Sequence, residues 1–266
     1  MRPRDFSRND MPKSIAKPPP QTLAAARKRL LGLRNPKDAE FLQRFFKTTP
    51  GQYGAGDQFL GIRVPATREV AREFHDLPID DIASLLKEKW HEARLLAVIL
   101  LSNRYAKGSP AERKKIFDLY VANAARVNNW DLVDASAANI VGAHLETRKR
   151  NLLYKLARSK NLWERRIAIV STFRFIRNDE FDDTLRISRA LMRDEHDLIH
   201  KAVGWMLREV GKRDASVLEA FLDEHAHELA RTTLRYAIER MTPEKKRRFM
   251  AAKQERATEP AASSRR

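Results

Sequence analysis

Apolar residues along this chain recur mostly at spacings of three and four positions, and short polar or proline-containing segments interrupt them roughly every 10–18 residues. This periodicity is typical of amphipathic helices joined by short turns. It predicts helices at residues 21–33, 36–48, 65–76, 78–88, 91–106, 110–126, 130–146, 148–158, 161–177, 181–192, 196–211, 214–224, 226–239 and 243–253. Prolines that follow a capping residue, as at Asn35-Pro36 and Ser109-Pro110, support several of the predicted starts.

The segments between these helices give no sign of a β-sheet. The apolar run at 98–101 lies inside a longer helical period, and the glycine-rich stretch 48–63 predicts a structured loop. Trp130, Trp163 and Trp205 follow one another at 33 and 42 residues, close to the length of a helical-pair repeat. The predicted fold class is therefore all-α, an α-solenoid of stacked antiparallel helix pairs with a concave binding face.

The charge balance indicates what such a face would bind. The 266 residues include 52 Lys and Arg against 35 Asp and Glu, a net charge of +17. Residues 1–20 contribute +3 and residues 241–266 contribute +5, so the body from 21 to 240 keeps +9. A basic body predicts a surface that binds phosphates and makes the predicted concave face a basic one.

The two ends of the chain lack the helical period. Residues 1–20 are charged and rich in proline, so we predict a disordered arm there, one helical domain at 21–253 and a disordered tail at 254–266. The absence of cysteine excludes disulfides and thiolate metal sites and suits a reducing cytoplasm. No signal-peptide core and no run of eighteen apolar residues occur, so we expect neither secretion nor contact with a membrane.

Trp130 and Asp134 lie four positions apart at a predicted helix start, which places an indole and a carboxylate on one helix face. Ala138 and Val141 continue that face, so Asp134 has an apolar setting. A carboxylate in such a setting would have a functional role if a ligand brings positive charge to it. The alternative is structural: with Asp131 as the N-cap, Asp134 would only stabilise the helix N-terminus.

Trp205 and a group of arginines have similar pairs of interpretations. Trp205 shares a helix face with Lys201 and Arg208, opposite an apolar stripe. It therefore either contacts a ligand or packs on a neighbouring repeat. Arg166 and Arg174 lie with Arg177 on a face separate from the apolar stripe of their own helix. That face is either solvated or, because all three residues are arginine, suited to phosphate.

Two further patterns do not hold up as cofactor sites. The glycine-rich segment 51–61 lacks the Gly-Lys-Ser/Thr ending of a phosphate-binding loop, and no strand precedes it. His196 and His200 have the spacing of a zinc-binding helix, but an aspartate stands where the catalytic glutamate belongs and no third ligand is evident. We therefore expect neither a metal nor an organic cofactor.

Four segments in order resemble the bacterial DNA alkylation repair glycosylases of the AlkD family, which are monomeric solenoids of HEAT-like antiparallel helical repeats. The resemblance covers roughly residues 36–215. The segments are residues 59–65 with Arg68, residues 130–134, residues 163–166 with Arg174, and residues 201–208.

The resemblance implies a role for each matching residue. Asp134 matches the catalytic aspartate, Trp130 and Trp205 match the tryptophans that flank the damaged nucleoside, and Arg166 matches the arginine that completes the cleft. The basic residues of the matching segments would face DNA; they are Arg63, Arg68, Arg174, Lys201 and Arg208. The chain departs from the family pattern in a longer loop at 48–57 and in Phe45, which replaces a tyrosine used for DNA contact.

The activity that the resemblance implies is excision of N7-alkylguanine and N3-alkyladenine from double-stranded DNA, by a monomer that needs no cofactor. It would act in the cytoplasm, at the nucleoid. Such an enzyme would clamp and bend the duplex and leave the lesion stacked. The alternative is a non-catalytic protein that binds damaged or branched DNA on the same scaffold, and a more distant one is a protein-binding helical scaffold.

Overall fold

The computed structural model describes residues 19–258, and residues 1–18 and 259–266 lie outside that description. Most of the predicted arm at 1–20 and the end of the predicted tail at 254–266 therefore lie outside the described residues. The last helix runs to Thr258, past its predicted end at 253. Residues 251–258 are mostly alanine and long charged or amide side chains, which are good helix formers, and this explains the extension.

Helices form all the regular structure of the described residues apart from one isolated bridge between Gln58 and Trp90. The helices are α1 (Leu23–Gly32), α2 (Pro36–Phe45), α3 (Val64–Glu73), α4 (Ile79–Leu85), α5 (His91–Lys107), α6 (Pro110–Ala122), α7 (Trp130–Ala137), α8 (Ala143–Leu145), α9 (Asn151–Ala157), α10 (Leu162–Ser171), α11 (Phe173–Ile176), α12 (Asp182–Ala190), α13 (Asp197–Arg213), α14 (Ala215–His225), α15 (Arg231–Ala237) and α16 (Pro243–Thr258), with a 3₁₀ turn at Ala124–Arg126 and a π-helical segment at Ala138–Gly142. The predicted all-α fold is confirmed.

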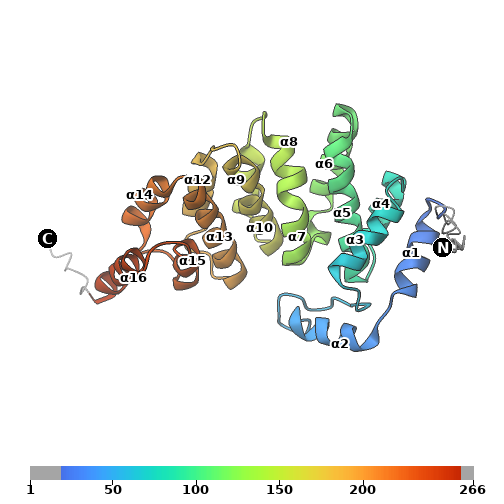
Figure 1. Cartoon of the computed structure of the whole chain (residues 1–266), viewed down its shortest axis with the longest axis horizontal. Helices are drawn as coiled ribbons and strands as arrows, with labels where there is room; N and C mark the ends of the chain where they lie inside the picture. Colours follow the sequence, from blue (N-terminus) through green and yellow to red (C-terminus); the bar gives the residue numbers. More distant parts are fainter. Residues whose placement is uncertain (1–18, 259–266) are drawn as a thin grey trace, which may run out of the picture.

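The helices stack in two layers to form an elongated solenoid (Figure 1). In one layer α3, α5, α7, α10, α13 and α15 each pack against the next. The other layer contains α4, α6, α9, α12 and α14, each packed against a helix of the first layer. This arrangement confirms the predicted α-solenoid, whereas the basic character of a concave face stays a prediction.

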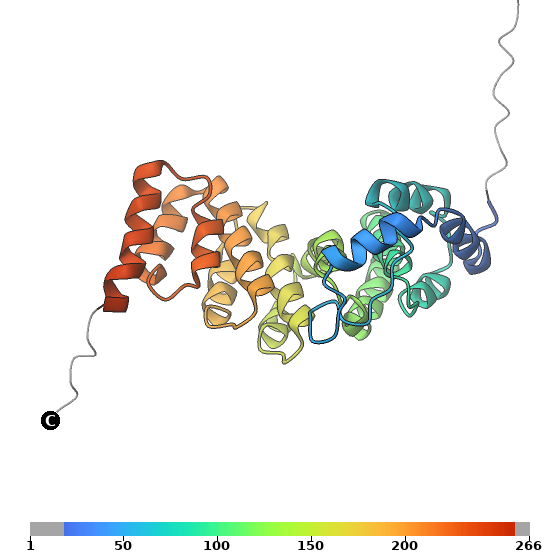
Figure 2. The same ribbon diagram turned by 90° about the horizontal axis from the view of Figure 1, so that it is seen from below.

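Helix α2 stands outside both layers. It lies with its following loop across the N-terminal half of the solenoid, on the side that Figure 2 views from below. Asn35 caps it, with its side-chain oxygen accepting the backbone N–H groups of Lys37 and Asp38. Leu42 and Phe46 form a small buried cluster with Phe59, and this cluster contacts Trp130. Helix α2 and the loop after it therefore cover the first turn of α7.

Two helices predicted as continuous are interrupted where backbones approach closely. Residues 130–146 contain the π-helical segment between α7 and α8, and residues 161–177 divide at Thr172 between α10 and α11. Gly142, at the end of the π-helical segment, lies so close to α10 that a Cβ there would be 2.3 Å from the carbonyl oxygen of Ser171. The wider π turn and the missing side chain together allow this contact.

Gly204 gives a test of this close packing. A Cβ at Gly204 would lie 2.5 Å from the carbonyl oxygen of Thr233, so Gly204→Ala should force α13 away from α15 and lower the free energy of unfolding by about 1–3 kcal/mol. Urea denaturation followed by circular dichroism measures this. Gly32→Ala is the matched control, because Gly32 has open space around it, and it should leave stability unchanged or raise it by up to about 1 kcal/mol. Equal stability of the two variants would show that α13 and α15 can separate at no cost.

Candidate functional site

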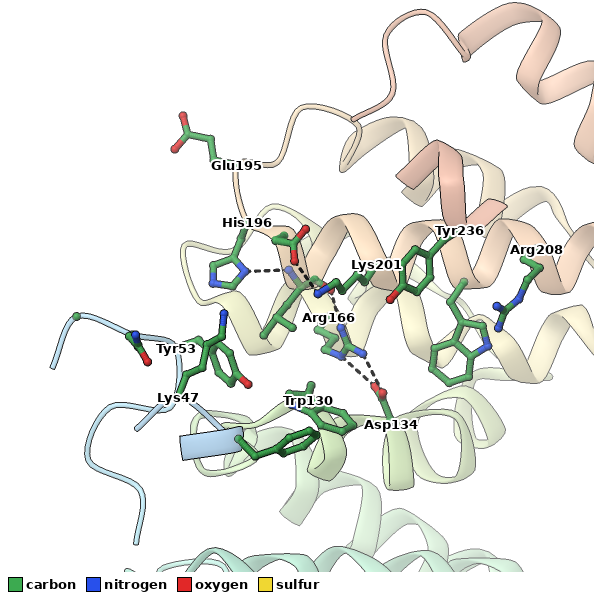
Figure 3. A pocket seen from close by; sticks show the side chains of 16 residues that line it. Lys47, Tyr53, Trp130, Asp134, Arg166, Glu195, His196, Lys201, Arg208 and Tyr236 are labelled. Carbon is green, nitrogen blue, oxygen red and sulfur yellow. Dashed lines mark hydrogen bonds and ion pairs between the residues drawn. The ribbon is translucent and has the colours of Figure 1, made fainter. Parts of the chain in front are cut away.

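A cleft of about 730 Å³ lies between the loop that follows α2 and the helices α7, α10, α13 and α15. Figure 3 shows its floor formed by Trp130 and Asp134, with Arg166 above them and Lys201 beyond. The cleft is lined by Phe45, Lys47, Gly51, Gln52, Tyr53, Trp130, Asp134, Arg166, Glu195, His196, Asp197, Leu198, Lys201, Trp205, Arg208 and Tyr236. All four residues predicted to be catalytic, and two of the five predicted to bind DNA, are therefore in one place.

A bidentate ion pair joins Asp134 to Arg166 at the centre of the cleft. The Nε and Nη2 atoms of Arg166 donate to the two carboxylate oxygens at 2.9 and 2.8 Å, and its Nη1 atom donates to the carbonyl oxygen of Leu198 at 2.5 Å. Arg166 is buried, whereas about a fifth of the Asp134 side chain is exposed. Burial raises the pKa of the Asp134 carboxyl above its ordinary value, and the charge of Arg166 opposes that rise.

The capping interpretation of this aspartate is wrong. Asn129 is the N-cap of α7, and its side-chain oxygen accepts the backbone N–H of Trp130 at 2.8 Å. Asp131 cannot serve as the cap, because it lies inside the first turn and one of its carboxylate oxygens contacts the His91 ring. Asp134 has both oxygens on Arg166, so its place is explained by the ion pair across two repeats.

The two tryptophans at the cleft are both partly packed and partly exposed. Trp130 stacks on Phe46 with ring centroids 5.3 Å apart and meets the edge of Phe45 at 6.1 Å. Trp205 lies 5.8 Å from the ring of Phe173 and donates its indole N–H to a glutamate of its own helix. One side of Trp205 therefore packs on a neighbouring repeat, and the remainder lines the cleft; its contact with a ligand stays a prediction.

The glycine-rich loop adds residues that sequence reasoning did not place at the site. Tyr53 lines the cleft, and its ring meets Trp163 edge-on at 6.2 Å. Burial raises the pKa of the Tyr53 phenol, while the Trp130 indole and the charge of Lys201 oppose the rise. Tyr236 reaches the same cleft from α15. No local sequence pattern indicates either tyrosine, because the first depends on the path of the loop and the second on how the last repeats stack.

Buried charged residues at the start of α5 hold this loop. The Glu92 carboxylate accepts the backbone N–H groups of Leu60, Gly61 and Ile62 at 2.8–3.1 Å. Arg94 pairs with Asp57 at 2.5 Å, and both side chains are buried. These residues could have been found from sequence, because a glutamate and an arginine at the start of an otherwise apolar helix must be buried with partners.

His91 completes the link between the loop and α7. Its Nε2 atom lies 2.8 Å from Asp131 and its Nδ1 atom 3.4 Å from Asp57. Burial alone would lower the pKa of His91, but the charge of Asp131 and the hydrogen bonds to both carboxylates outweigh it and raise the pKa to about 9. For Asp57, burial would raise the pKa, and the contacts with His91 and Arg94 lower it instead. His91 is thus a buried cation that fixes the residue next to Trp130.

The predicted DNA-binding residues fall into two groups. Lys201 and Arg208 line the cleft, where Lys201 pairs with Asp197 at 2.8 Å and Arg208 pairs with acidic neighbours on α13 and near the end of α15. The other three lie outside it. Arg63 pairs with Asp38 at 2.7 Å, Arg68 is exposed on α3, and Arg174 makes a bidentate pair with Glu146.

Neither a metal-binding cluster nor a membrane-spanning helix is found among the described residues. Within residues 19–258, no group of three or more His, Asp or Glu side chains is arranged to hold a metal ion. His196, one of the two histidines considered above, lines the cleft and accepts the backbone N–H of Leu198 at 3.1 Å. Over the same range, no helix has the length and apolar character needed to cross a membrane.

Known proteins share the family and the fold of this chain. A family model described as DNA alkylation repair enzyme matches residues 26–241, a range that includes every residue of the cleft. Among solved structures, the chain is similar to one described as "Predicted DNA alkylation repair enzyme from Enterococcus faecalis", with a TM-score of 0.62 and 19% identity, over 79% of this chain and 97% of that one. At that identity the likeness shows a shared fold. No curated protein matches the chain.

The charge of His91 predicts a pH dependence of stability. Since its pKa is about 9 in the folded protein and near 6.5 when unfolded, its contribution is fully present below pH 6.5 and is lost as the pH rises through 9. That contribution is about 3 kcal/mol. The urea unfolding midpoint of the native protein should therefore be lower at pH 9.5 than at pH 6.5. In His91→Gln the two midpoints should differ much less. The control His75→Gln removes an exposed histidine and should keep the native pH profile.

Proposed function

The chain belongs to the DNA alkylation repair enzyme family, and from that premise we propose that it is an AlkD-like glycosylase that hydrolyses the N-glycosidic bond of N7-alkylguanine and N3-alkyladenine in duplex DNA. The observation that carries this proposal is the Asp134 carboxylate, which Arg166 holds in a partly buried position beside Trp130 and Trp205. A protein that only binds phosphates has little use for a negative charge there.

The chemistry that we propose depends on the charge of the damaged base. An alkylated purine of this kind is a cation and therefore a good leaving group, so the barrier lies mainly in the positive charge that develops on the sugar. The C1′–N bond breaks with its electron pair going to the base, which leaves as a neutral purine. Asp134 stabilises the oxocarbenium-like sugar, and water then adds to C1′ and gives up a proton. The raised pKa of Asp134 makes the carboxylate a better acceptor for that proton.

Arg166 acts as a positioning residue in this proposal. Its guanidinium uses two N–H groups on Asp134 and a third on the carbonyl oxygen of Leu198, so the carboxylate has one orientation. A fixed charge needs no reorganisation when the sugar becomes positive, which is how preorganised electrostatic stabilisation lowers a barrier.

Trp130 and Trp205 would flank the damaged nucleoside, and their ring faces suit contact with its sugar as that sugar becomes positively charged. Lys201 and Arg208 lie at the same cleft, where they can hold the phosphates next to the lesion. Arg63, Arg68 and Arg174 would contact DNA further from the reaction centre. We propose that the protein acts as a monomer at the nucleoid, clamping a bent duplex through sugar and phosphate while the lesion stays stacked.

Replacing Asp134 with Asn gives the direct test. The native protein should release N7-methylguanine from methylated duplex DNA, as identified by chromatography, and Asp134→Asn should lower the single-turnover rate by at least about a hundredfold. DNA affinity should stay the same or rise slightly, because a negative charge near phosphates is removed.

Asp118→Asn serves as the control, because Asp118 is an exposed carboxylate on α6. Circular dichroism spectra should match among the three proteins. Tight binding without release of any base by the native protein would favour the non-catalytic DNA binder instead.

Trp205→Ala should affect excision more than folding. Trp205 is only partly buried. Its truncation should therefore lower the free energy of unfolding by far less than the about 3–5 kcal/mol expected for a buried tryptophan. Trp163→Ala is the matched control, since Trp163 is buried in α10. In denaturant melts, Trp163→Ala should be the less stable of the two variants. In single-turnover excision, the folded fraction of Trp205→Ala should be the slower. A stability loss for Trp205→Ala as large as that of Trp163→Ala, with normal excision, would remove Trp205 from the site.

A further inference from the structure

Helix α2 carries two large aromatic side chains on its outer surface. Phe41 and Phe45 lie four positions apart and are 46% and 53% exposed, whereas Leu42 and Phe46 face inward and are buried. The inward side chains already supply the apolar contact that holds this part of the chain to Trp130. The two exposed rings therefore form an aromatic ridge, Phe41 and Phe45, that the fold itself does not require.

The aromatic ridge is continuous with the cleft. Phe45 lines the cleft and meets Trp130 edge-on at 6.1 Å, and Phe41 stacks on Phe45 with centroids 6.1 Å apart and planes 15° apart. A line of rings thus leads from the cleft floor outward along α2, the helix that stands outside the two layers (Figures 1 and 2). A ligand that fills the cleft and extends beyond it on this side meets the ridge next.

Charges beside the ridge suit a polyanion. The Arg63 guanidinium lies over the Phe41 ring at 5.2 Å, and Lys47 at the cleft end is exposed. Arg44, on the neighbouring face of α2, is exposed and only loosely paired with Glu40 at 3.8 Å. Arg63 also pairs with Asp38 at 2.7 Å, an exposed pair that a phosphate can replace. An apolar edge with cations beside it suits the surface of a duplex, in which stacked bases lie between two rows of phosphates.

We propose that the Phe41–Phe45 ridge is a wedge that enters the minor groove beside the lesion and partly unstacks the base step on that side, while the lesion stays in the helix, stacked on its other neighbour. This proposal rests on the glycosylase function proposed above. The C1′ atom of a nucleotide borders the minor groove, so a carboxylate that must reach C1′ and a ridge next to it would face the same groove. Apolar wedges such as phenylalanine kink duplexes in this way. The kink would supply the bend that brings the sugar to Asp134.

The test uses a duplex with one N7-methylguanine and a 2-aminopurine at the adjacent position, whose fluorescence rises when it is unstacked. Binding of Asp134→Asn, which should hold the lesion without cleaving it, should raise the fluorescence, and Phe41→Ala in the same background should abolish most of the rise. In the otherwise native chain, Phe41→Ala should lower excision about tenfold, the size expected for loss of one aromatic stacking contact. The salt dependence of affinity should not change, because no phosphate contact is removed.

Two controls keep the result specific. Leu31→Ala removes an exposed apolar side chain on α1, 52% exposed and not part of the cleft, and should change none of these readings. Phe41→Trp keeps a large ring and should retain the fluorescence rise. Excision by Phe41→Ala should recover towards the native rate on a duplex with a mismatch beside the lesion, because that step is already easy to unstack.

The outcomes separate the two proposals. An unchanged fluorescence rise with normal excision in Phe41→Ala would overturn the wedge while leaving the glycosylase intact. If the native protein releases no base, the glycosylase proposal fails, and the fluorescence on binding still reports whether the ridge unstacks DNA. Loss of a dimer by Phe41→Ala in sedimentation of the DNA-free protein would assign the ridge to a second copy of this chain and overturn the wedge.

Discussion

Arg166 holds the candidate site together, because its guanidinium joins three successive repeats. It reaches from α10 to Asp134 on α7 and to the carbonyl oxygen of Leu198 on α13. Any change in the stacking of these helices would move the carboxylate relative to the two tryptophans. The solenoid thus does more than present a surface, since the geometry of the reacting group depends directly on how its repeats pack. Close contacts through Gly142 and Gly204, where no side chain fits, keep that packing tight.

A second set of buried charges fixes the other side of the cleft. Glu92 and the His91–Asp57–Asp131 group hold a loop that makes almost no regular structure of its own. Buried ion pairs of this kind contribute little net stability over well-packed apolar residues, because desolvation offsets their attraction. Their effect is to select one conformation, and here that conformation puts Tyr53 at the cleft and Phe46 under Trp130. The loop is longer than the resemblance would predict, and this network fixes its path at Asp57 and residues 60–62.

The helices could be predicted from sequence because their apolar faces repeat with the helical period, and the candidate residues could be named because Trp130 and Asp134 share one such face. Arg166 could be assigned to the cleft only through resemblance, and its pairing with Asp134 was not predicted, since that pairing spans 32 residues and depends on repeat stacking. The N-cap considered for α7, Asp131, was wrong by two positions: Asn129 is the cap, and the Asp131 carboxylate instead contacts His91 in another repeat. The π-helical turn at Ala138–Gly142 and the position of Tyr236 have no local signal at all, as both follow from contacts between repeats.

Net charge is a poor guide to where cations are available on this surface. Arg63, Arg174 and Arg208 all pair with carboxylates, so much of the basic body is internally neutralised. Exposed pairs of this kind are worth at most about 1 kcal/mol, and a phosphate can replace the carboxylate at little cost. The pair of Asp134 with Arg166 differs, because the arginine is buried and has three hydrogen bonds to satisfy. The structure therefore separates an adjustable rim, whose cations can change partners as DNA arrives, from a centre whose charges stay in place while the chemistry occurs.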